Sequence, residues 1–205
     1  MITRRLIQLF WGLALYGFSM ALMLRANLGL DPWDVLHQGL APRLGLSFGM
    51  TVNLVGLAVL LLWIPLRQRP GIGTVLNIIV IGTVVDLSLP ILPAPEGYPW
   101  RFAFLISGIV LNGIAGGAYI GAGLGAGPRD GLMTGLARRT GWPIKLVRTA
   151  IELTVLATGW LMGGTVGVGT ALYALIIGWV VHYALPFFTL VRKDVGPQPA
   201  VHAKV

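Results

Sequence analysis

An internal duplication constrains this chain more than any other feature of its sequence. Residues 10–92 align without a gap on residues 106–188, at a constant offset of 96 positions. Matching leucines and valines mean little in an apolar chain, so the rarer residues decide. The rarer matches are Pro32 with Pro128, Asp34 with Asp130, Arg43 with Arg139, Pro90 with Pro186, and Gly71-Ile72-Gly73-Thr74 with Gly167-Val168-Gly169-Thr170. A duplication in an apolar protein is typical of channels and secondary transporters, whose binding sites lie where the repeats meet.

Composition places the chain in a membrane. Hydrophobic residues make up 56% of it and charged residues 11%, with a mean hydropathy of +0.81, so there is too little charge to cover a soluble surface. A helix needs about 20 apolar residues to cross the hydrocarbon. Such stretches lie at 6–24, 49–66, 72–92, 102–124, 146–164 and 169–190. We therefore expect six spans, followed by a short cytoplasmic tail at 192–205.

Two shorter segments, 32–46 and 128–142, are too short to span comfortably and suit re-entrant or interfacial helices. If they do not cross, each copy has an odd number of spans and the second copy lies upside down. We predict an all-α membrane protein with six transmembrane helices plus two short re-entrant or interfacial helices, arranged as two inverted-topology repeats of three spans each. Repeat one covers residues 1–98 and repeat two covers residues 99–191.

The distribution of basic residues tests this topology. It places twelve Lys and Arg residues on one side of the membrane and three on the other, namely Arg25, Arg43 and Arg101. An excess of Lys and Arg marks the cytoplasmic side, so both termini are expected there. If the short segments crossed, the count would be eleven against four, so the total alone does not decide. Equivalent loops are more informative: 67–69 carries two arginines whereas 163–168 carries no charge, and this reversal favours inverted repeats.

Each short segment opens with a glycine and proline signature, Gly29-Leu30-Asp31-Pro32-Trp33-Asp34 and Gly125-Ala126-Gly127-Pro128-Arg129-Asp130. The prolines predict where the helices begin, with Asp31 or Gly127 as the N-cap. A helix that begins inside the membrane directs free N–H groups and a partial positive charge at what lies before it, which suits an anionic group. The candidate substrate-binding residues are Gly29, Asp31, Pro32, Trp33, Asp34, Gly127, Pro128, Arg129 and Asp130. The alternative is that Asp34 and Asp130 only cap their own helices.

Ionisable residues inside spans are costly, so they usually face partners or water. Arg148 and Glu152 lie one helical turn apart near the start of the fifth span. They either contribute to the substrate-binding site or form only an ion pair near the interface. Asp86 and His182 occupy equivalent positions in the third and sixth spans. Inverted repeats place them at different depths, so we expect two separate proton- or ion-coupling positions or, alternatively, interfacial residues near helix ends.

The segments Gly29 to Gly39, Gly125 to Gly135 and Gly163 to Thr170, together with Arg148 and Glu152, resemble those of YczE/YyaS/YitT-like bacterial integral membrane proteins. The resemblance covers nearly the whole chain. It implies a multi-pass protein of the bacterial cytoplasmic (inner) membrane, in a family of which some members are tied to the regulation of secondary-metabolite production. It supplies no established active site to carry over.

The sequence contains no nucleophile elbow, phosphate loop, zinc-spaced histidine pair or cysteine, so we expect no enzyme, no cofactor and no bound metal. Basic residues lie at the ends of spans, so no nucleic-acid partner is expected. We predict a transporter or channel-like carrier of a small polar solute, anionic or zwitterionic, that binds at the repeat interface within the lipid bilayer, either alone or as a homo-oligomer. The alternative is a non-transporting regulatory or accessory subunit that acts through a protein partner.

Overall fold

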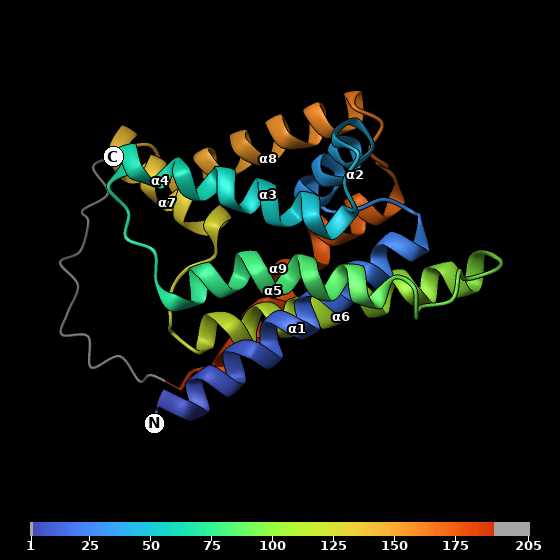
Figure 1. Cartoon of the computed structure of the whole chain (residues 1–205), viewed down its shortest axis with the longest axis horizontal. Coiled ribbons are helices and arrows are strands. Elements are labelled where there is room, and N and C mark those ends of the chain that lie inside the picture. Colours follow the sequence, from blue (N-terminus) through green and yellow to red (C-terminus); the bar gives the residue numbers. More distant parts are fainter. Residues whose placement is uncertain (1, 191–205) are drawn as a thin grey trace.

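The computed structural model describes residues 2–190, and within that range it consists of helices joined by turns and loops, with no strand (Figure 1). The helices are α1 (Ile2–Ala26), α2 (Pro32–Leu44), α3 (Phe48–Leu61), α4 (Trp63–Leu66), α5 (Ile72–Ser88), α6 (Tyr98–Gly121), α7 (Pro128–Thr140), α8 (Ile144–Leu161) and α9 (Val168–Phe188). The predicted tail at 192–205 lies outside the described residues. The predicted boundary between residues 98 and 99 falls at the start of α6.

Helix starts recur at the offset found in the sequence. Adding 96 to the first residues of α1, α2, α3 and α5 gives the first residues of α6, α7, α8 and α9. Left-handed backbone positions recur in the same way. They are Asn27 and Gly123, Gly29 and Gly125, Gly45 and Gly141, and Arg67 and Gly163. Gly45 and Gly141 end α2 and α7, because glycine adopts this conformation without steric cost.

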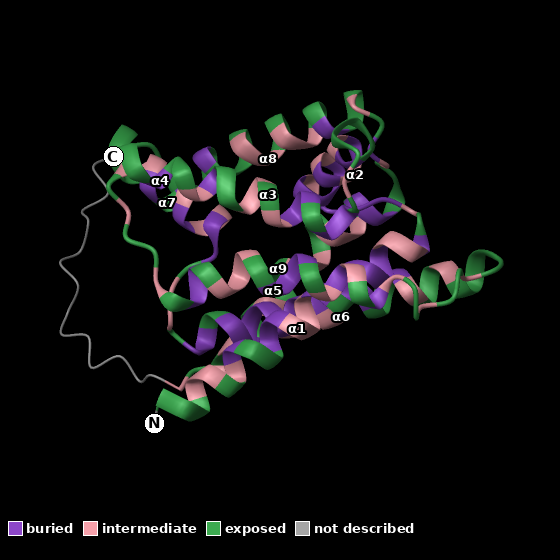
Figure 2. Ribbon diagram, viewed as in Figure 1, coloured by how far each residue is buried: buried purple, intermediate pink, exposed green. Residues whose placement is uncertain are grey.

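The helices form two layers (Figure 1). In one layer α1 packs against α5 and α6, and α6 packs against α9. In the other, α2 packs against α3 and α8, and α7 packs against α3, α4 and α8. Contacts between α3 and α5 join the layers. Buried residues gather along α1, α2 and α6, whereas α8 and α9 are mostly exposed (Figure 2).

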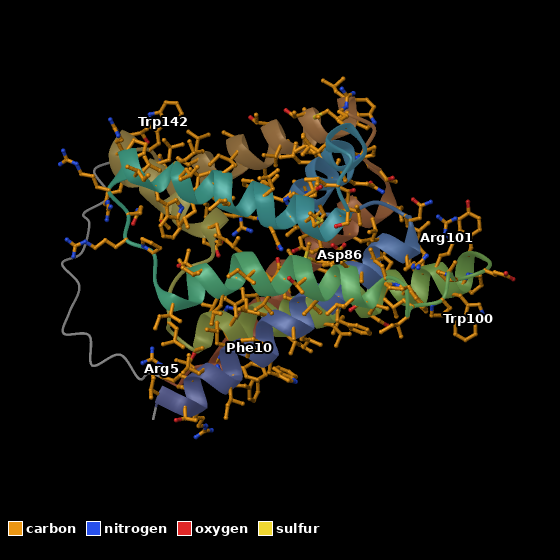
Figure 3. The ribbon with its side chains drawn as sticks, viewed as in Figure 1. Arg5, Phe10, Asp86, Trp100, Arg101 and Trp142 are labelled. Carbon is orange, nitrogen blue, oxygen red and sulfur yellow. The ribbon has the colours of Figure 1, made fainter. Side chains whose placement is uncertain are left out.

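Two equivalent arginines make equivalent contacts between α1 and α6. The Nε of Arg5 donates to the carbonyl of Ala122 at 2.7 Å, and the Nε of Arg101 donates to the carbonyl of Ala26 at 2.8 Å. Each arginine stands near the start of one helix and satisfies carbonyl groups at the end of the other, where the helix itself leaves them unpaired. The two helices therefore run antiparallel, and Figure 3 shows Arg5 and Arg101 at opposite ends of the molecule.

Each short helix packs against the other half of the chain. At Gly159 of α8, a side chain would collide with the backbone of Leu36 in α2, so this contact requires glycine. The position equivalent to Gly159 is Trp63, which follows the end of α3. Trp63 lies against Gly131 of α7, and its Nε1 donates to the carbonyl of Pro128 at 3.0 Å. The contact between α2 and α8 is thus closer than the equivalent contact of α7.

The two halves also differ in how α3 packs against α5 and how the equivalent helices α8 and α9 are placed. Helix α3 lies against α5, where Gly49 and Gly82 bring the two backbones together. Asp86 of α5 fixes this contact, since its Oδ1 accepts from the N–H of Gly49 at 2.8 Å and its Oδ2 accepts from the hydroxyl of Ser47 at 2.5 Å. In the second half, nothing lies within 4 Å of a Cβ built on Gly178, the counterpart of Gly82. Helices α8 and α9 therefore stand apart where α3 and α5 touch.

Four helical segments are long and apolar enough to cross a membrane, namely Ile2–Ala26, Phe48–Leu66, Tyr98–Gly121 and Val168–Phe188. They coincide with four of the six spans that the sequence predicts. The other two fall short for identifiable reasons: α5 has 17 residues, and α8 carries Lys145, Arg148 and Glu152. The segment Phe48–Leu66 is interrupted after Leu61 because Pro65 has no N–H to donate to the carbonyl of Leu61.

Candidate functional site

A cavity of about 120 Å³ lies between the two layers. This volume is several times the roughly 10–15 Å³ that one water molecule needs. Residues from both layers and from both halves of the chain line it. The lining includes the starts of α2 and α7, with Asp31, Pro32 and Trp33 from one and Gly127, Pro128, Arg129 and Asp130 from the other. Two segments that the sequence separates by 96 positions therefore meet at one site.

The start of α2 is capped by its own chain. Gly29 has φ +112°, a conformation that favours glycine, and it turns the chain out of α1. Asp31 is the N-cap, as predicted, and its Oδ1 accepts from the N–H groups of Trp33 at 2.9 Å and Asp34 at 3.2 Å. The Asp31 carboxylate thus occupies the place where the end of this helix would bind an anion.

The start of α7 has a different chemistry. Gly125, the counterpart of Gly29, has φ +137°, and the N-cap Gly127 offers no side chain to accept from the helix. Asp130 does not replace it as a cap, because its Oδ2 accepts from the hydroxyl of Tyr119 at 2.8 Å. The first N–H groups of α7 therefore carry no side-chain cap. In α2, Asp31 rather than Asp34 accepts from the first N–H groups. The alternative that Asp34 and Asp130 only cap their own helices stays a prediction.

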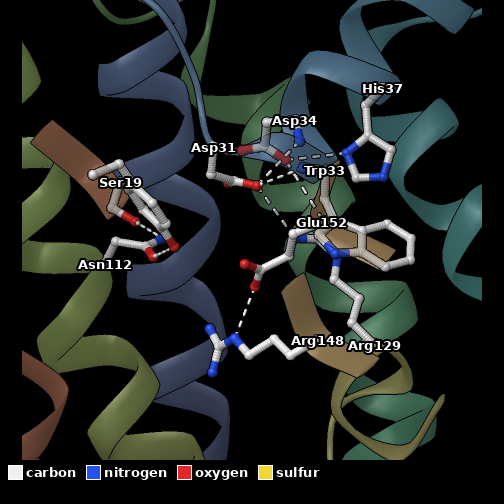
Figure 4. Close-up of polar contacts among 10 residues, drawn as sticks. Ser19, Asp31, Trp33, Asp34, His37, Asn112, Arg129, Arg148 and Glu152 are labelled. Atoms are coloured by element: carbon white, nitrogen blue, oxygen red, sulfur yellow. Dashed lines mark hydrogen bonds and ion pairs between the residues drawn. The ribbon is translucent and has the colours of Figure 1, made fainter. Parts of the chain in front are cut away.

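Arg129 connects the two short helices (Figure 4). Its Nη1 lies 3.7 Å from Oδ1 of Asp31, and its Nη2 lies 3.5 Å from Oδ1 of Asp34. The guanidinium also lies over the ring of Trp33, 5.0 Å from the ring centroid. Oδ1 of Asp34 also contacts Nδ1 of the buried His37 at 3.0 Å. A buried charge needs this kind of compensation, so Arg129 and the two carboxylates stabilise one another.

Arg148 and Glu152 form the ion pair that their spacing predicts. The Nε of Arg148 donates to Oε1 of Glu152 at 2.8 Å, and both residues line the cavity (Figure 4). The Arg148 side chain is 59% exposed, so the pair lies at the open side of the cavity rather than at its base. The structure thus places the pair in the candidate site while also showing the ion pair of the alternative interpretation.

The structure does not bring Asp86 or His182 to the cavity. Asp86 holds the start of α3 through Ser47 and Gly49. The ring of His182 packs edge-on against Tyr183, with 5.5 Å between the ring centroids. Neither residue lines the cavity that holds the other candidate residues. Their coupling role stays a prediction.

Sequence reasoning missed the aromatic part of the site. Tyr16 of α1, Tyr119 of α6 and Tyr173 of α9 all line the cavity. Tyr173 donates to Oδ1 of Asn112 at 2.9 Å, and Nδ2 of Asn112 donates to Ser19 at 2.9 Å. The duplication contained a signal for part of this set. Polar residues stand at equivalent positions of both copies in two cases, Tyr16 with Asn112 and Asn77 with Tyr173.

Comparison with known proteins gives a family but no activity. The sequence profile of DUF6198, a family of unknown function, matches residues 3–186. An uncharacterized protein of Haemophilus influenzae is 41% identical over 177 residues, which cover 86% of this chain and 81% of that protein. The uncharacterized membrane protein YczE of Bacillus subtilis is 39% identical over 179 residues, covering 86% and 83%. The uncharacterized protein YyaS of Bacillus subtilis is 25% identical over 182 residues, covering 85% and 89%. No solved structure matches the chain.

Proposed function

The chain belongs to the DUF6198 family, with relatives that include a Bacillus subtilis membrane protein, and we propose that it carries a small polar solute across the bacterial inner membrane. The family match confirms the YczE-like resemblance that the sequence motifs carry. Neither the family description nor the names of the relatives assigns an activity, so the proposal rests on the geometry of the cavity. It assigns no catalytic step to the chain.

The proposal includes two inverted repeats. The antiparallel course of α1 and α6 supports it, as do the reciprocal bonds of Arg5 and Arg101. A second reciprocal pair supports it as well: the N–H of Gly73 donates to the carbonyl of Leu124 at 2.9 Å, and the N–H of Gly169 donates to the carbonyl of Leu28 at 2.7 Å. In both pairs of bonds, replacing each residue by its equivalent 96 positions away gives the other bond of the pair. An approximate twofold axis between the halves requires this reciprocity. With both termini in the cytoplasm, this topology requires α5 and α8 to cross the membrane as well, as its third and fifth spans.

One observation carries the transport proposal. The starts of two short helices, one from each half, face one cavity that contains buried charged side chains. Broken or shortened helices that meet near the middle of the membrane are the recurring site architecture of secondary transporters. Buried ionisable residues in a membrane protein also mark solute or ion pathways more often than stable packing, since they are costly to retain.

The unequal packing of the two halves supports a carrier. Helices α3 and α5 touch at Gly49 and Gly82, whereas their counterparts α8 and α9 stand apart at Gly178. In alternating access, one side of a central site is closed while the other is open, and inverted repeats exchange these arrangements. Of the solute classes expected from the sequence, a zwitterion fits better than an anion, because the Asp31 carboxylate already occupies the start of α2.

Flux through proteoliposomes tests the proposal. We would reconstitute the full chain and measure uptake of radiolabelled amino acids, amines and carboxylates. Gly56 lines the cavity, so Gly56→Leu should fill it and reduce uptake at least tenfold. Ala103→Leu is the control, because Ala103 is an exposed residue of α6 outside the cavity lining, and it should leave uptake within about twofold. Equal uptake by both variants would place the pathway elsewhere. No uptake of any solute, together with co-purification of a stoichiometric partner, would favour the regulatory or accessory subunit.

A further inference from the structure

We propose that the cavity recognises an organic cation, a solute whose ammonium group binds among the cavity tyrosines and carboxylates. This inference rests on the proposed function, since it takes the cavity as the solute site, and it narrows the solute to one charge class. Three independent observations point to a cation: the balance of charges, the set of unpaired polar atoms, and the aromatic lining.

The charged side chains at the cavity do not balance one another. The cavity and the residues directly behind it hold four carboxylates, on Asp31, Asp34, Asp130 and Glu152, and two guanidinium groups, on Arg129 and Arg148. Arg148 is paired with Glu152, and Arg129 lies between Asp31 and Asp34. Within residues 2–190, the Asp130 carboxylate has no basic side chain in ion-pair range, and it accepts a hydrogen bond only from the hydroxyl of Tyr119. Two negative charges are left over, so a solute with a positive group completes the site whereas an anion adds to the excess.

Buried polar atoms without a hydrogen-bond partner also indicate a cation. Asp31 and Asp34 are 3% and 0% exposed, and the Oδ2 atom of each has no hydrogen-bond partner. His37 is 1% exposed, and its Nε2 also lacks a partner. When Nδ1 of a neutral His37 donates to Oδ1 of Asp34, 3.0 Å away, Nε2 is an acceptor. Buried polar atoms are nearly always paired, so the unpaired atoms of Asp31 and His37 in the cavity lining call for a partner with N–H donors, such as a primary ammonium group. The lining also holds one unpaired donor, Nε1 of Trp33, which can donate to an acceptor such as the carboxylate of a zwitterion.

The aromatic lining completes the site. Tyr16, Tyr119 and Tyr173 reach the cavity from three different helices. The rings of Tyr16 and Tyr119 are edge-to-face, with centroids 6.1 Å apart. The negative face of an aromatic ring attracts cations, and desolvated sites strengthen this attraction. Trp33 already uses its ring face in this way for Arg129, so the tyrosines are the rings left for a solute.

This assignment changes one expectation from the sequence. The sequence predicts an anionic or zwitterionic solute, but the guanidinium groups of Arg129 and Arg148 already have carboxylate partners. A zwitterion still fits, because its ammonium group can bind the carboxylates while its own carboxylate binds the uncapped start of α7 at Gly127.

Four small solutes with three carbon atoms each test the charge class. We would measure binding of propylammonium, β-alanine, propionate and 1-propanol to the purified full chain in detergent, from the shift of the thermal unfolding midpoint at increasing concentration. The cation should bind, and the zwitterion should bind with similar affinity or more weakly. Propionate and 1-propanol should produce no saturable shift. Binding of propionate in preference to propylammonium, or saturable binding by none of the four, would overturn the cation site.

A pair of variants at Tyr16 tests the contribution of the aromatic lining. Removing the ring by Tyr16→Leu should weaken propylammonium binding about tenfold, whereas Tyr16→Phe keeps the ring and should stay within about twofold. Unchanged binding by Tyr16→Leu would contradict the aromatic contribution. A loss of about tenfold by Tyr16→Phe would contradict it too, because that variant keeps the ring, and this outcome can be measured even if the Leu variant unfolds. Flux separates this inference from the proposed function. Uptake of propionate without propylammonium would refute the cation site alone, and cation binding without any uptake would refute only transport.

Discussion

Nη2 of Arg129 lies 3.5 Å from Oδ1 of Asp34, and the two side chains come from different short helices. Removing the guanidinium leaves Asp31 and Asp34 as buried, uncompensated carboxylates. Arg129→Ala should therefore lower the free energy of unfolding by about 2–4 kcal/mol, at the lower part of the range for buried pairs because Arg129 is 25% exposed. Denaturant titration in detergent measures this. Arg138→Ala, an exposed arginine of the same helix, should cost less than about 0.5 kcal/mol, and an equal loss in both variants would contradict the buried role.

The contact between α2 and α8 depends on Gly159. A methyl group there would collide with the backbone of Leu36, so the helices must separate. Gly159→Ala should destabilise the protein by about 1–3 kcal/mol, the usual cost of overpacking. Gly178→Ala is the matched control, because nothing lies near its Cβ position and alanine favours the helix by up to about 1 kcal/mol. A stable Gly159→Ala variant would show that α2 and α8 are not held as closely as described.

Inverted topology can be measured by labelling. The chain contains no cysteine, so single substitutions need no prior engineering. Arg69→Cys and Thr165→Cys stand at equivalent positions of the two copies. We expect an impermeant thiol reagent to label Cys at position 69 only from the cytoplasmic side and Cys at position 165 only from the opposite side. Labelling of both from one side would establish parallel repeats and remove the proposed twofold axis.

Substitution of Asp86 distinguishes a role in proton-coupled uptake from a role in capping the start of α3. Its carboxylate accepts from Ser47 and Gly49 at the start of α3, so Asp86→Ala should cost about 1 kcal/mol of stability, the usual price of a lost cap. If capping is its whole role, the dependence of uptake on a proton gradient should be the same in the variant as in the wild-type protein. Loss of that dependence, with uptake down the solute gradient retained, would establish the coupling role. His182→Gln is the parallel measurement at the equivalent position of α9.

Local features of the sequence predicted the helix starts well. Pro32 and Pro128 begin α2 and α7 at the predicted residues, because proline at the first helical position gives up no hydrogen bond and fixes φ. Arg148 and Glu152 pair as their spacing predicts, since one helical turn is enough to bring them together. These predictions depend only on neighbours along the chain, and this is why a single sequence was sufficient.

Features that depend on packing between the halves could not be predicted. Tyr16 and Tyr119 meet only because α1 crosses α6, and the sequence does not specify that crossing. The partners of Arg129 could not be predicted for the same reason. Arg129 reads as a free cation in the sequence, whereas in the fold it is compensated by Asp31 and Asp34 of a helix from the other copy.

Each short helix packs against the other half of the chain, and this has a consequence for biosynthesis. Helix α2 packs mainly against α8, and the N–H of Leu30, just before α2, donates to the carbonyl of Thr165. A ribosome completes α2 well before it begins α8, so the inward face of α2 enters the bilayer without its partner. Lipid, translocon or chaperone must cover that face in the interval, and a nascent chain arrested before α8 should be a substrate for membrane quality control.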